Sequence, residues 1–219
     1  MDSSTLATLI TILDLAGVAV FAVTGALVAS RKQMDIVGFA LLATVTGIGG
    51  GTFRDLVLGV APVFWVQQPV YVGLCIGVAA VVFFTAHIPE SRYRLLLWLD
   101  AIGLSVFCVV GADKALEAGA SPFIAVVMGV ITATFGGVVR DVLGGEIPVI
   151  LRREIYATAA LAGAATFVVT LRLDLPGASE ALIGFAVCLA IRSLALWRGW
   201  SLPVYLARPG RSPDEIGRR

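Results

Sequence analysis

The sequence predicts an all-α integral membrane protein with seven transmembrane helices, on the basis of its high apolar content, its few charges and its long apolar runs. Hydrophobic residues make up 58% of the 219 residues and charged residues 14%, and the mean hydropathy is +0.95. Soluble domains are only about 45–50% apolar and need more polar surface than this chain can supply. Disorder is excluded because disordered chains are poor in apolar residues. A net charge of +1 also excludes an ordinary nucleic-acid-binding surface.

Seven apolar segments approach the roughly 20 residues that a helix needs to cross a bilayer. They do not alternate polar and apolar residues, as the strands of a membrane barrel would. The first contains Asp14 and follows a segment without basic residues, unlike a secretory signal. In chain order, the expected helices are 6–30, 36–58, 69–87, 95–116, 122–143, 155–171 and 180–197.

Basic residues flank these segments asymmetrically, and such residues are enriched on the cytoplasmic side of membrane proteins. With seven spans, successive connections lie on alternate sides. We therefore expect a multi-pass protein of the cell (inner) membrane, with the N-terminus extracytoplasmic and the C-terminus cytoplasmic. The side poor in basic residues carries little beyond Lys114 and Arg172. The other side carries Arg31, Lys32, Arg92, Arg94, Arg152, Arg153, Arg198, Arg208, Arg211, Arg218 and Arg219.

The chain matches itself at an offset of 86 residues, from Asp14 to Gly163. The matched residues are mostly Asp, Arg, Gly and Pro, which chance agreement between two apolar runs would not favour. Because each copy holds three spans, an odd number, the second copy enters the membrane from the opposite side. The sequence thus predicts two inverted three-helix repeats, 1–92 and 93–178, followed by a seventh helix and a cytoplasmic tail, 179–219.

Glycine clusters occur at repeat-related positions in the second and fifth expected helices. Each glycine costs a helix interior about 1 kcal/mol relative to alanine, so the clusters predict a kink or an unwound turn. Paired breaks are typical of transport paths, whereas small residues also allow helices to pack closely. Nearby threonines either line a polar path or bond back to helix carbonyls. The residues concerned are Gly49, Gly50, Gly51, Gly136 and Gly137, with Thr46, Thr52, Thr132 and Thr134.

Charged residues within the expected helices form two predicted groups that are related by the repeat. Charges at membrane depth are costly and mark either function or a partner. In each group, an arginine would neutralise one carboxylate and leave another facing a water path; the alternative is an ion pair that only pins helices together. The groups are an outer cluster of Asp14, Arg54 and Asp55 and an inner cluster of Asp100, Arg140 and Asp141.

Two other charges are candidates for a gate. Lys114 ends the fourth expected helix, where it either moves in the membrane field or extends its charge to the interface. Arg192 lies in the last expected helix, where it either pairs with a carboxylate or reaches the cytoplasmic headgroups.

The two copies of Gly-Gly-x-x-Arg-Asp, at 50–55 and 136–141, are each followed by Gly and Pro. In these motifs the chain resembles the prokaryotic branch of the trimeric intracellular cation (TRIC) channel family, also called UPF0126 and described in family terms as a glycine transporter domain. The resemblance implies a homotrimer of inverted-repeat subunits. Each subunit would hold a pore for K⁺, and also Na⁺, lined by the second and fifth helices. Animal members bind phosphoinositide through a lysine-containing motif, for which this chain has no counterpart.

The sequence favours a monovalent cation channel, and the alternative is a secondary transporter of a small solute such as glycine. Inverted repeats with broken helices serve both functions. An enzyme is not expected, because one histidine and three separated cysteines supply neither a catalytic constellation nor a structural metal site. We expect no cofactor beyond permeant K⁺ and Na⁺, although a bound lipid would fit. The expected partners are membrane lipids, monovalent cations and further copies of the chain, with no nucleic acid.

Overall fold

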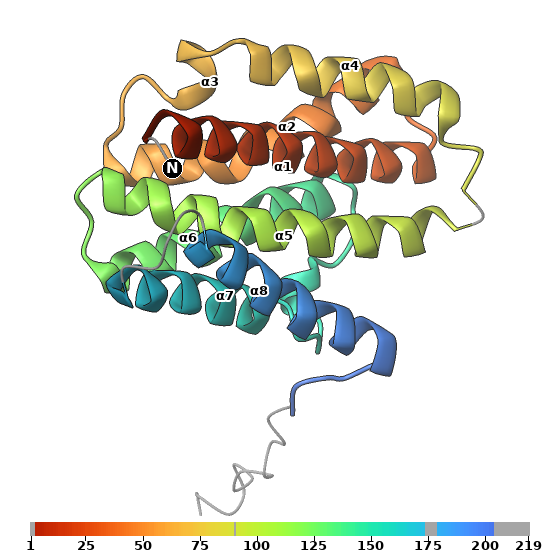
Figure 1. Cartoon of the computed structure of the whole chain (residues 1–219). Helices are drawn as coiled ribbons and strands as arrows, with labels where there is room; N and C mark the ends of the chain where they lie inside the picture. Colours follow the sequence, from red (N-terminus) through yellow and green to blue (C-terminus); the bar gives the residue numbers. More distant parts are fainter. Residues whose placement is uncertain (1–2, 90, 174–178, 204–219) are drawn as a thin grey trace, which may run out of the picture.

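The computed structural model describes residues 3–89, 91–173 and 179–203, which form a helical bundle (Figure 1). The predicted cytoplasmic tail from residue 204 onward lies outside these residues. The longer helices are α1 (Ser3–Arg31), α2 (Ile36–Leu58), α4 (Val70–Thr85), α5 (Arg92–Glu117), α6 (Pro122–Leu143), α7 (Ala157–Thr170) and α8 (Ser179–Arg198). The short ones are α3 (Phe64–Gln67) and the 3-10 segments Val149–Leu151 and Leu171–Leu173.

Five of the described helices, α1, α2, α5, α6 and α8, are long and apolar enough to cross a membrane. The all-α membrane class predicted from the sequence is therefore confirmed. Helices α4 and α7 are apolar but have only 16 and 14 residues, which at about 1.5 Å per residue is less than the roughly 30 Å of a bilayer core. The expected helices 69–87 and 155–171 agree with α4 and α7 to within two residues at each end.

Local signals in the sequence account for the bounds of α2 and α6, which agree with the expected 36–58 and 122–143. The Asp35 carboxylate accepts a hydrogen bond from the Gly38 amide at 2.8 Å and caps the start of α2. At its end, Gly59 adopts a φ of 69°, a left-handed conformation that glycine reaches without strain. Helix α6 has Pro122 in its first turn, where the missing N–H costs nothing, and ends at Gly144.

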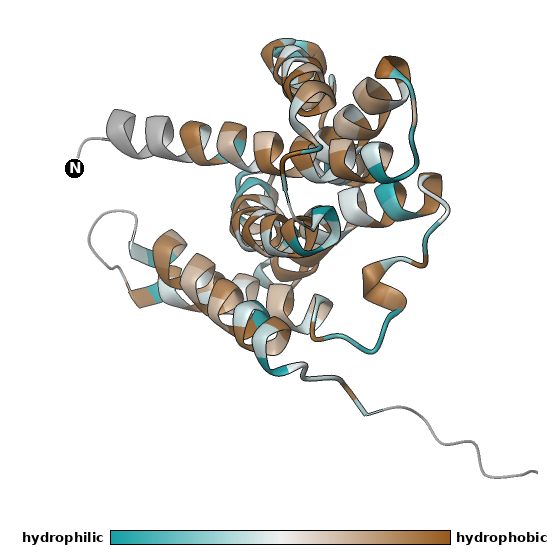
Figure 2. Cartoon of the chain, turned by 90° about the vertical axis from the view of Figure 1, so that its right-hand side faces the viewer, coloured by the Kyte–Doolittle hydropathy of each residue, from teal (hydrophilic) through white to brown (hydrophobic). Residues whose placement is uncertain are grey.

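Large apolar side chains are exposed on the sides of the bundle. Val37 is 69% exposed, Phe84 72% and Phe123 75%. Figure 2 views the molecule along the bundle and shows that hydrophobic colouring covers most of the helices. Exposed apolar side chains of this size are what the lipid-facing surface of a membrane protein presents, whereas soluble monomers rarely expose large apolar patches.

Basic side chains gather at one end of the bundle, where four predicted connections of the same side meet. Arg31 at the end of α1 lies 3.0 Å from Glu146, which follows α6. Arg92 at the start of α5 donates to the Ser30 carbonyl at 3.5 Å. This arrangement places the ends of α1 and α6 and the start of α5 together. We refer to it below as the basic end.

Helices that correspond under the 86-residue repeat pack against each other at the centre of the bundle, α1 against α5 and α2 against α6. The Phe21 and Phe107 rings, which are repeat equivalents, lie 5.1 Å apart. A Cβ atom added at Gly17 would press against Phe107, and one added at its equivalent Gly103 would press against Phe21. Reciprocal contacts of this kind are the pattern that a two-fold relation between equivalent surfaces produces. Helix α8 packs against α5 and α7, outside this pairing.

Candidate functional site

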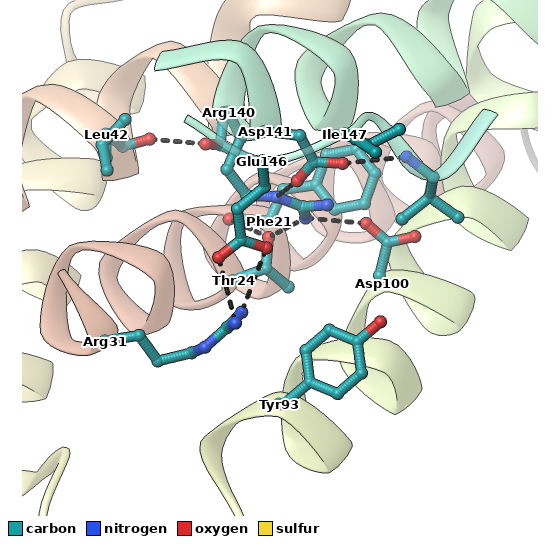
Figure 3. A network of polar contacts seen from close by, with 12 residues as sticks. Phe21, Thr24, Arg31, Leu42, Tyr93, Asp100, Arg140, Asp141, Glu146 and Ile147 are labelled. Atoms are coloured by element: carbon teal, nitrogen blue, oxygen red, sulfur yellow. Dashed lines mark hydrogen bonds and ion pairs between the residues drawn. The ribbon is translucent and has the colours of Figure 1, made fainter. Parts of the chain in front are cut away.

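The inner cluster is centred on Arg140, whose side chain is fully buried between three helices (Figure 3). Its guanidinium donates to Asp100 on α5 at 2.8 Å and to the neighbouring Asp141 at 2.8 Å. A third hydrogen bond, of 2.9 Å, reaches the Thr24 hydroxyl on α1. The structure thus brings together the three residues that the sequence grouped. It adds Thr24, which has no hydroxyl equivalent in the repeat because position 110 is valine.

Part of the hydrogen-bonding capacity of the inner cluster is unused. Asp100 Oδ2, Arg140 Nη2 and the Tyr156 hydroxyl are buried and have no hydrogen-bond partner of good geometry among the described residues. Two of these atoms lie beside Gly137, because a Cβ atom there would lie 3.1 Å from the Tyr156 oxygen and 3.5 Å from Arg140 Nη2. Asp100 Oδ1, which accepts from Arg140, would lie 3.6 Å from it. Buried polar groups of this kind bind water or a polar ligand. The glycine keeps the space in front of them free of a side chain.

The outer cluster is built differently, although its residues are repeat equivalents of the inner one. Arg54 donates twice to the adjacent Asp55, at 2.6 and 2.9 Å. Asp14 accepts a hydrogen bond of 2.7 Å from the Tyr71 hydroxyl on α4. In the inner cluster the equivalent carboxylate, Asp100, accepts its hydrogen bond from Arg140 instead. The repeat equivalent of Tyr71 is Ala157, so this hydroxyl exists only in the first half. The prediction that each arginine neutralises one carboxylate and leaves another free describes the pairing of Arg54 with Asp55 in the outer cluster. It does not describe the inner cluster, where Arg140 bonds to both Asp100 and Asp141.

The aspartates of the two Arg-Asp motifs also hold the loop that follows each helix. The second carboxylate oxygen of Asp55 accepts the Phe64 amide at 3.0 Å, and that of Asp141 accepts the Val149 amide at 3.0 Å. Before each anchor the chain turns at a glycine of positive φ, Gly59 in the first half and its equivalent Gly145 in the second. This loop-anchoring role was not predicted from the sequence. The equal spacing of Arg-Asp, Gly and Pro in both copies is the pattern that could have indicated it.

Asp141→Asn should lower the free energy of unfolding by about 1.5–3 kcal/mol, the range for a hydrogen bond to a charged group. Asp141 accepts from Arg140 at one oxygen and from the Val149 amide at the other. An asparagine side chain is uncharged and has only one oxygen, so it cannot accept at both positions. Unfolding in detergent, followed by circular dichroism, measures the change. Asp35→Asn is a matched control, because Asp35 also accepts a backbone amide but is exposed. Equal losses for the two variants would contradict the anchoring role of Asp141.

The glycine clusters do not break their helices, so the expected unwound turn is wrong. Helices α2 and α6 are described without interruption through Gly49–Gly51 and through Gly136 and Gly137. The physical reason is close packing between the two helices. A Cβ atom at Gly50 would lie closer than 3.0 Å to the Thr132 carbonyl oxygen, and one at Gly136 equally close to the Thr46 carbonyl oxygen. These contacts are reciprocal under the repeat, and they make up the α2–α6 crossing.

The remaining glycines of the clusters flank this crossing. Gly49 lies against Gly136, with 3.8 Å between its Cβ position and the Gly136 Cα. Gly51 faces the Phe64 ring, which would lie 2.7 Å from an added Cβ. Phe53 and Phe135 stack beside the crossing with 4.4 Å between ring centroids. Backbone and aromatic rings therefore fill the contact between α2 and α6.

Three of the four threonines near the glycines bond back to their own helix. The hydroxyl of Thr46 donates to the Leu42 carbonyl, that of Thr52 to Ile48, and that of Thr134 to Val130. Thr132 differs, because its buried hydroxyl has no partner among the described residues. Of the two roles considered from the sequence, bonding back to carbonyls describes the first three.

The two candidate gate residues lie at opposite ends of the bundle. Lys114 lines a cavity of about 340 Å³ together with Glu117 and two residues of the outer cluster, Arg54 and Asp55. Arg192 lies at the basic end and is held by Glu154, whose carboxylate is 2.7 Å away. Pairing with a carboxylate, one of the two roles considered for Arg192, is therefore what the structure shows.

A group of polar contacts at the basic end lies beside the inner cluster and was not predicted. Glu146 accepts from Arg31, and lies 3.8 Å from Lys32 and 3.9 Å from Arg152. The Arg31 guanidinium also lies 4.9 Å from the centre of the Tyr93 ring (Figure 3). These contacts join α1, α5 and the loop after α6 where the inner cluster approaches the end of the bundle.

Comparison with known sequences gives matches over most of the chain. A profile of the family described as "Glycine transporter" matches residues 11–87 and again 97–172. The two matches begin at residues 11 and 97, so the 86-residue repeat is confirmed. A UPF0126 membrane protein of Vibrio cholerae is 42% identical, over 90% of this chain and 83% of its own length. The UPF0126 inner membrane protein YadS of Escherichia coli K12 is 43% identical, over 94% and 98%.

Solved structures with the same fold are described as cation channels. An orthologue of the TRIC trimeric intracellular cation channel from Rhodobacter sphaeroides is 61% identical, with a TM-score of 0.86, over 88% of this chain and 100% of that one. A second structure, from work on conductance through TRIC cation channels, is 32% identical, with a TM-score of 0.80, over 91% and 98%. At these identities the chain resembles the two solved proteins in sequence as well as in fold.

Proposed function

Since this chain belongs to the prokaryotic TRIC channel family, also called UPF0126, we propose that it is a channel for monovalent cations, chiefly K⁺ and also Na⁺. The observation that carries the proposal is the charge at the two ends of the α2–α6 crossing. The outer cluster and the inner cluster each contain two buried carboxylates and one buried arginine. Each therefore has one net negative charge, which favours cations over anions. The family is one of channels and not of enzymes.

We place the permeation path along α2 and α6, between the two clusters. Helix α2 ends at the outer cluster, whereas α6 carries the inner cluster toward the basic end. The backbones of α2 and α6 lie close together at Gly50 and Gly136, and in this proposal that contact is the closed constriction of the path. Conduction then requires the two helices to separate there. Separation would expose the Thr46 and Thr132 carbonyl oxygens, groups of the kind that line cation-selective filters.

The proposed architecture has seven spans in two inverted repeats, 1–92 and 93–178, followed by 179–219. It is supported by the opposite directions of the equivalent helices α1 and α5 in Figure 1 and by the reciprocal contacts between the halves. The short helices α4 and α7 would complete their crossing with the segments beside them. The basic end would face the cytoplasm of the inner membrane, with the N-terminus outside. Three chains would form a homotrimer, as the Rhodobacter sphaeroides orthologue is described.

Asp14→Asn should lower K⁺ conductance about fivefold in reconstituted bilayers. The reason is that a carboxylate about 4 Å from a K⁺ ion in water attracts it by about 1 kcal/mol, which corresponds to about a fivefold change in occupancy. The amide oxygen can still accept the Tyr71 hydrogen bond, so the change removes charge with little change of shape. Tyr71→Phe is the matched control, because it keeps the carboxylate and removes the hydrogen bond. Unchanged K⁺ conductance of assembled Asp14→Asn would exclude Asp14 from the path.

The second candidate function is secondary transport of glycine, which the description of the matching family profile favours. The same reconstituted protein distinguishes the two. Single-channel current steps in K⁺, with no saturable glycine uptake, are the result expected for a channel. Saturable uptake of glycine without conductance would overturn the channel and establish a transporter instead.

A further inference from the structure

A basic pocket lies at the basic end, between the segment before α7 and the C-terminal part of α8 with the residues that follow it. Its volume is about 410 Å³, and its lining includes Arg152, Arg153, Glu154, Arg192 and Trp200. Three arginines against one glutamate leave two positive charges without a carboxylate in the lining. Neither the proposed path nor the loop anchors use this pocket.

Arg192 is the buried charge of this pocket. Its side chain is 1% exposed, although it lines the pocket from the last turns of α8. One terminal nitrogen donates to Glu154 at 2.7 Å and the other to the Ile155 carbonyl at 3.1 Å. The Nε atom is buried and has no partner among the described residues. A guanidinium with an unused donor is suited to an anion with several oxygen acceptors.

The walls of the pocket are fixed by the backbone. Glu154 and Ser201 form an antiparallel bridge, which ties the segment before α7 to the chain after α8. The Leu202 amide donates to the Arg153 carbonyl at 3.1 Å in the same place. Gly199, with a φ of 66°, provides the turn that brings this chain back. The backbone that carries Arg152 and Arg153 is therefore held in place by hydrogen bonds to the chain after α8.

The rim of the pocket is aromatic and cationic. Trp200 is 46% exposed and Trp197, one helical position before Arg198, is 74% exposed. The Arg198 guanidinium lies 5.3 Å from the Trp200 ring and 5.9 Å from the Trp197 ring. Tryptophan at the end of a membrane helix marks the headgroup level of the bilayer. The pocket thus opens where lipid phosphates lie.

We propose that this basic pocket binds the phosphate headgroup of an anionic membrane phospholipid. Arginine pairs with phosphate in a planar, bidentate geometry, and basic pockets between membrane helices on the cytoplasmic side hold such headgroups. A free phosphate ion offers the same chemistry. The lipid is favoured because Leu196 and Trp200 place apolar surface in the same pocket. Glu146, which lies 3.9 Å from Arg152, is shared with Arg31 and Lys32. The pocket therefore keeps a net positive charge, which suits a headgroup with two phosphates, such as that of cardiolipin.

The test measures the melting temperature of the full-length protein in neutral detergent against added cardiolipin, phosphatidylcholine or sodium phosphate. Cardiolipin should raise the melting temperature. Arg153→Gln should increase the cardiolipin concentration that gives half of this rise about fivefold, because one arginine contributes about 1 kcal/mol to the attraction of an anionic headgroup. Arg153 is exposed, so this variant should fold. Arg192→Gln should weaken binding further if it folds.

The matched control is Arg94→Gln, which removes an exposed arginine on α5 with the same change of net charge. It should leave the response to cardiolipin unchanged. Equal weakening by Arg94→Gln and Arg153→Gln would overturn the pocket, because it would show only general attraction to the surface. An equal response to phosphatidylcholine would overturn the need for an anionic lipid. Sodium phosphate reproducing the full rise would overturn the lipid as its source.

Discussion

Arg140→Ala is expected to lower the free energy of unfolding by about 3–5 kcal/mol, the loss typical of removing one partner from a buried ion pair. The guanidinium is fully buried and contacts two carboxylates and the Thr24 hydroxyl. Without it, Asp100 and Asp141 would remain as two buried negative charges with no cation between them. They would have to take up protons or admit water, and α1, α5 and α6 would lose their common contact. Unfolding in detergent, followed by circular dichroism, measures the loss.

Arg54→Ala is the matched control for this variant, because Arg54 is the repeat equivalent and is also buried. Among the described residues it pairs with the adjacent Asp55 alone, and its guanidinium lies 5.9 Å from the centre of the Phe64 ring. We therefore expect a smaller loss of stability than for Arg140→Ala. Adding Asp100→Asn to Arg140→Ala should restore part of the stability by removing one unpaired charge. Equal losses at the two arginines, with no restoration, would contradict the asymmetry between the clusters.

The elements that the sequence predicted well are those whose signals are local. Helices α2 and α6 begin and end at capping or glycine positions, and their bounds were predictable for that reason. The short helix α3 was not predicted, because four residues show no periodicity and its place depends on the Asp55 carboxylate. The bridge between Glu154, before α7, and Ser201, after α8, was not predicted either. Contacts between distant segments decide these cases.

The site was predictable to the extent that the repeat marks it. The charged residues of both clusters are repeat equivalents, and their grouping follows from the 86-residue offset. Tyr71, Tyr156 and Thr24 were missed because none has an equivalent of the same type in the other half. A glycine cluster in a helix looks the same in the sequence whether it bends the helix or allows a neighbouring helix to approach. Only the position of the partner helix decides between these roles, and that partner lies 86 residues away in the chain.

Gly50→Ala and Gly136→Ala are expected to force α2 and α6 apart. Each added methyl would lie closer than 3.0 Å to a carbonyl oxygen of the opposite helix, and backbone cannot rotate away as a side chain can. Overpacking of this kind costs about 1–3 kcal/mol and occasionally more. The two variants should have similar effects because the contacts are reciprocal, and the double variant should lose less than the sum, since the first methyl already separates the helices.

Gly77→Ala on α4 is the control that separates this effect from helix propensity. No heavy atom lies within 4 Å of a Cβ at Gly77, so the methyl meets open space and alanine favours the helix by up to about 1 kcal/mol. Stability should therefore fall for Gly50→Ala and hold or rise for Gly77→Ala, as measured by unfolding in detergent. If the α2–α6 crossing is the constriction, Gly50→Ala in assembled protein should also raise the open probability in bilayers. Stability of Gly50→Ala equal to that of Gly77→Ala would mean that the crossing is loosely packed, and the closed state would need another explanation.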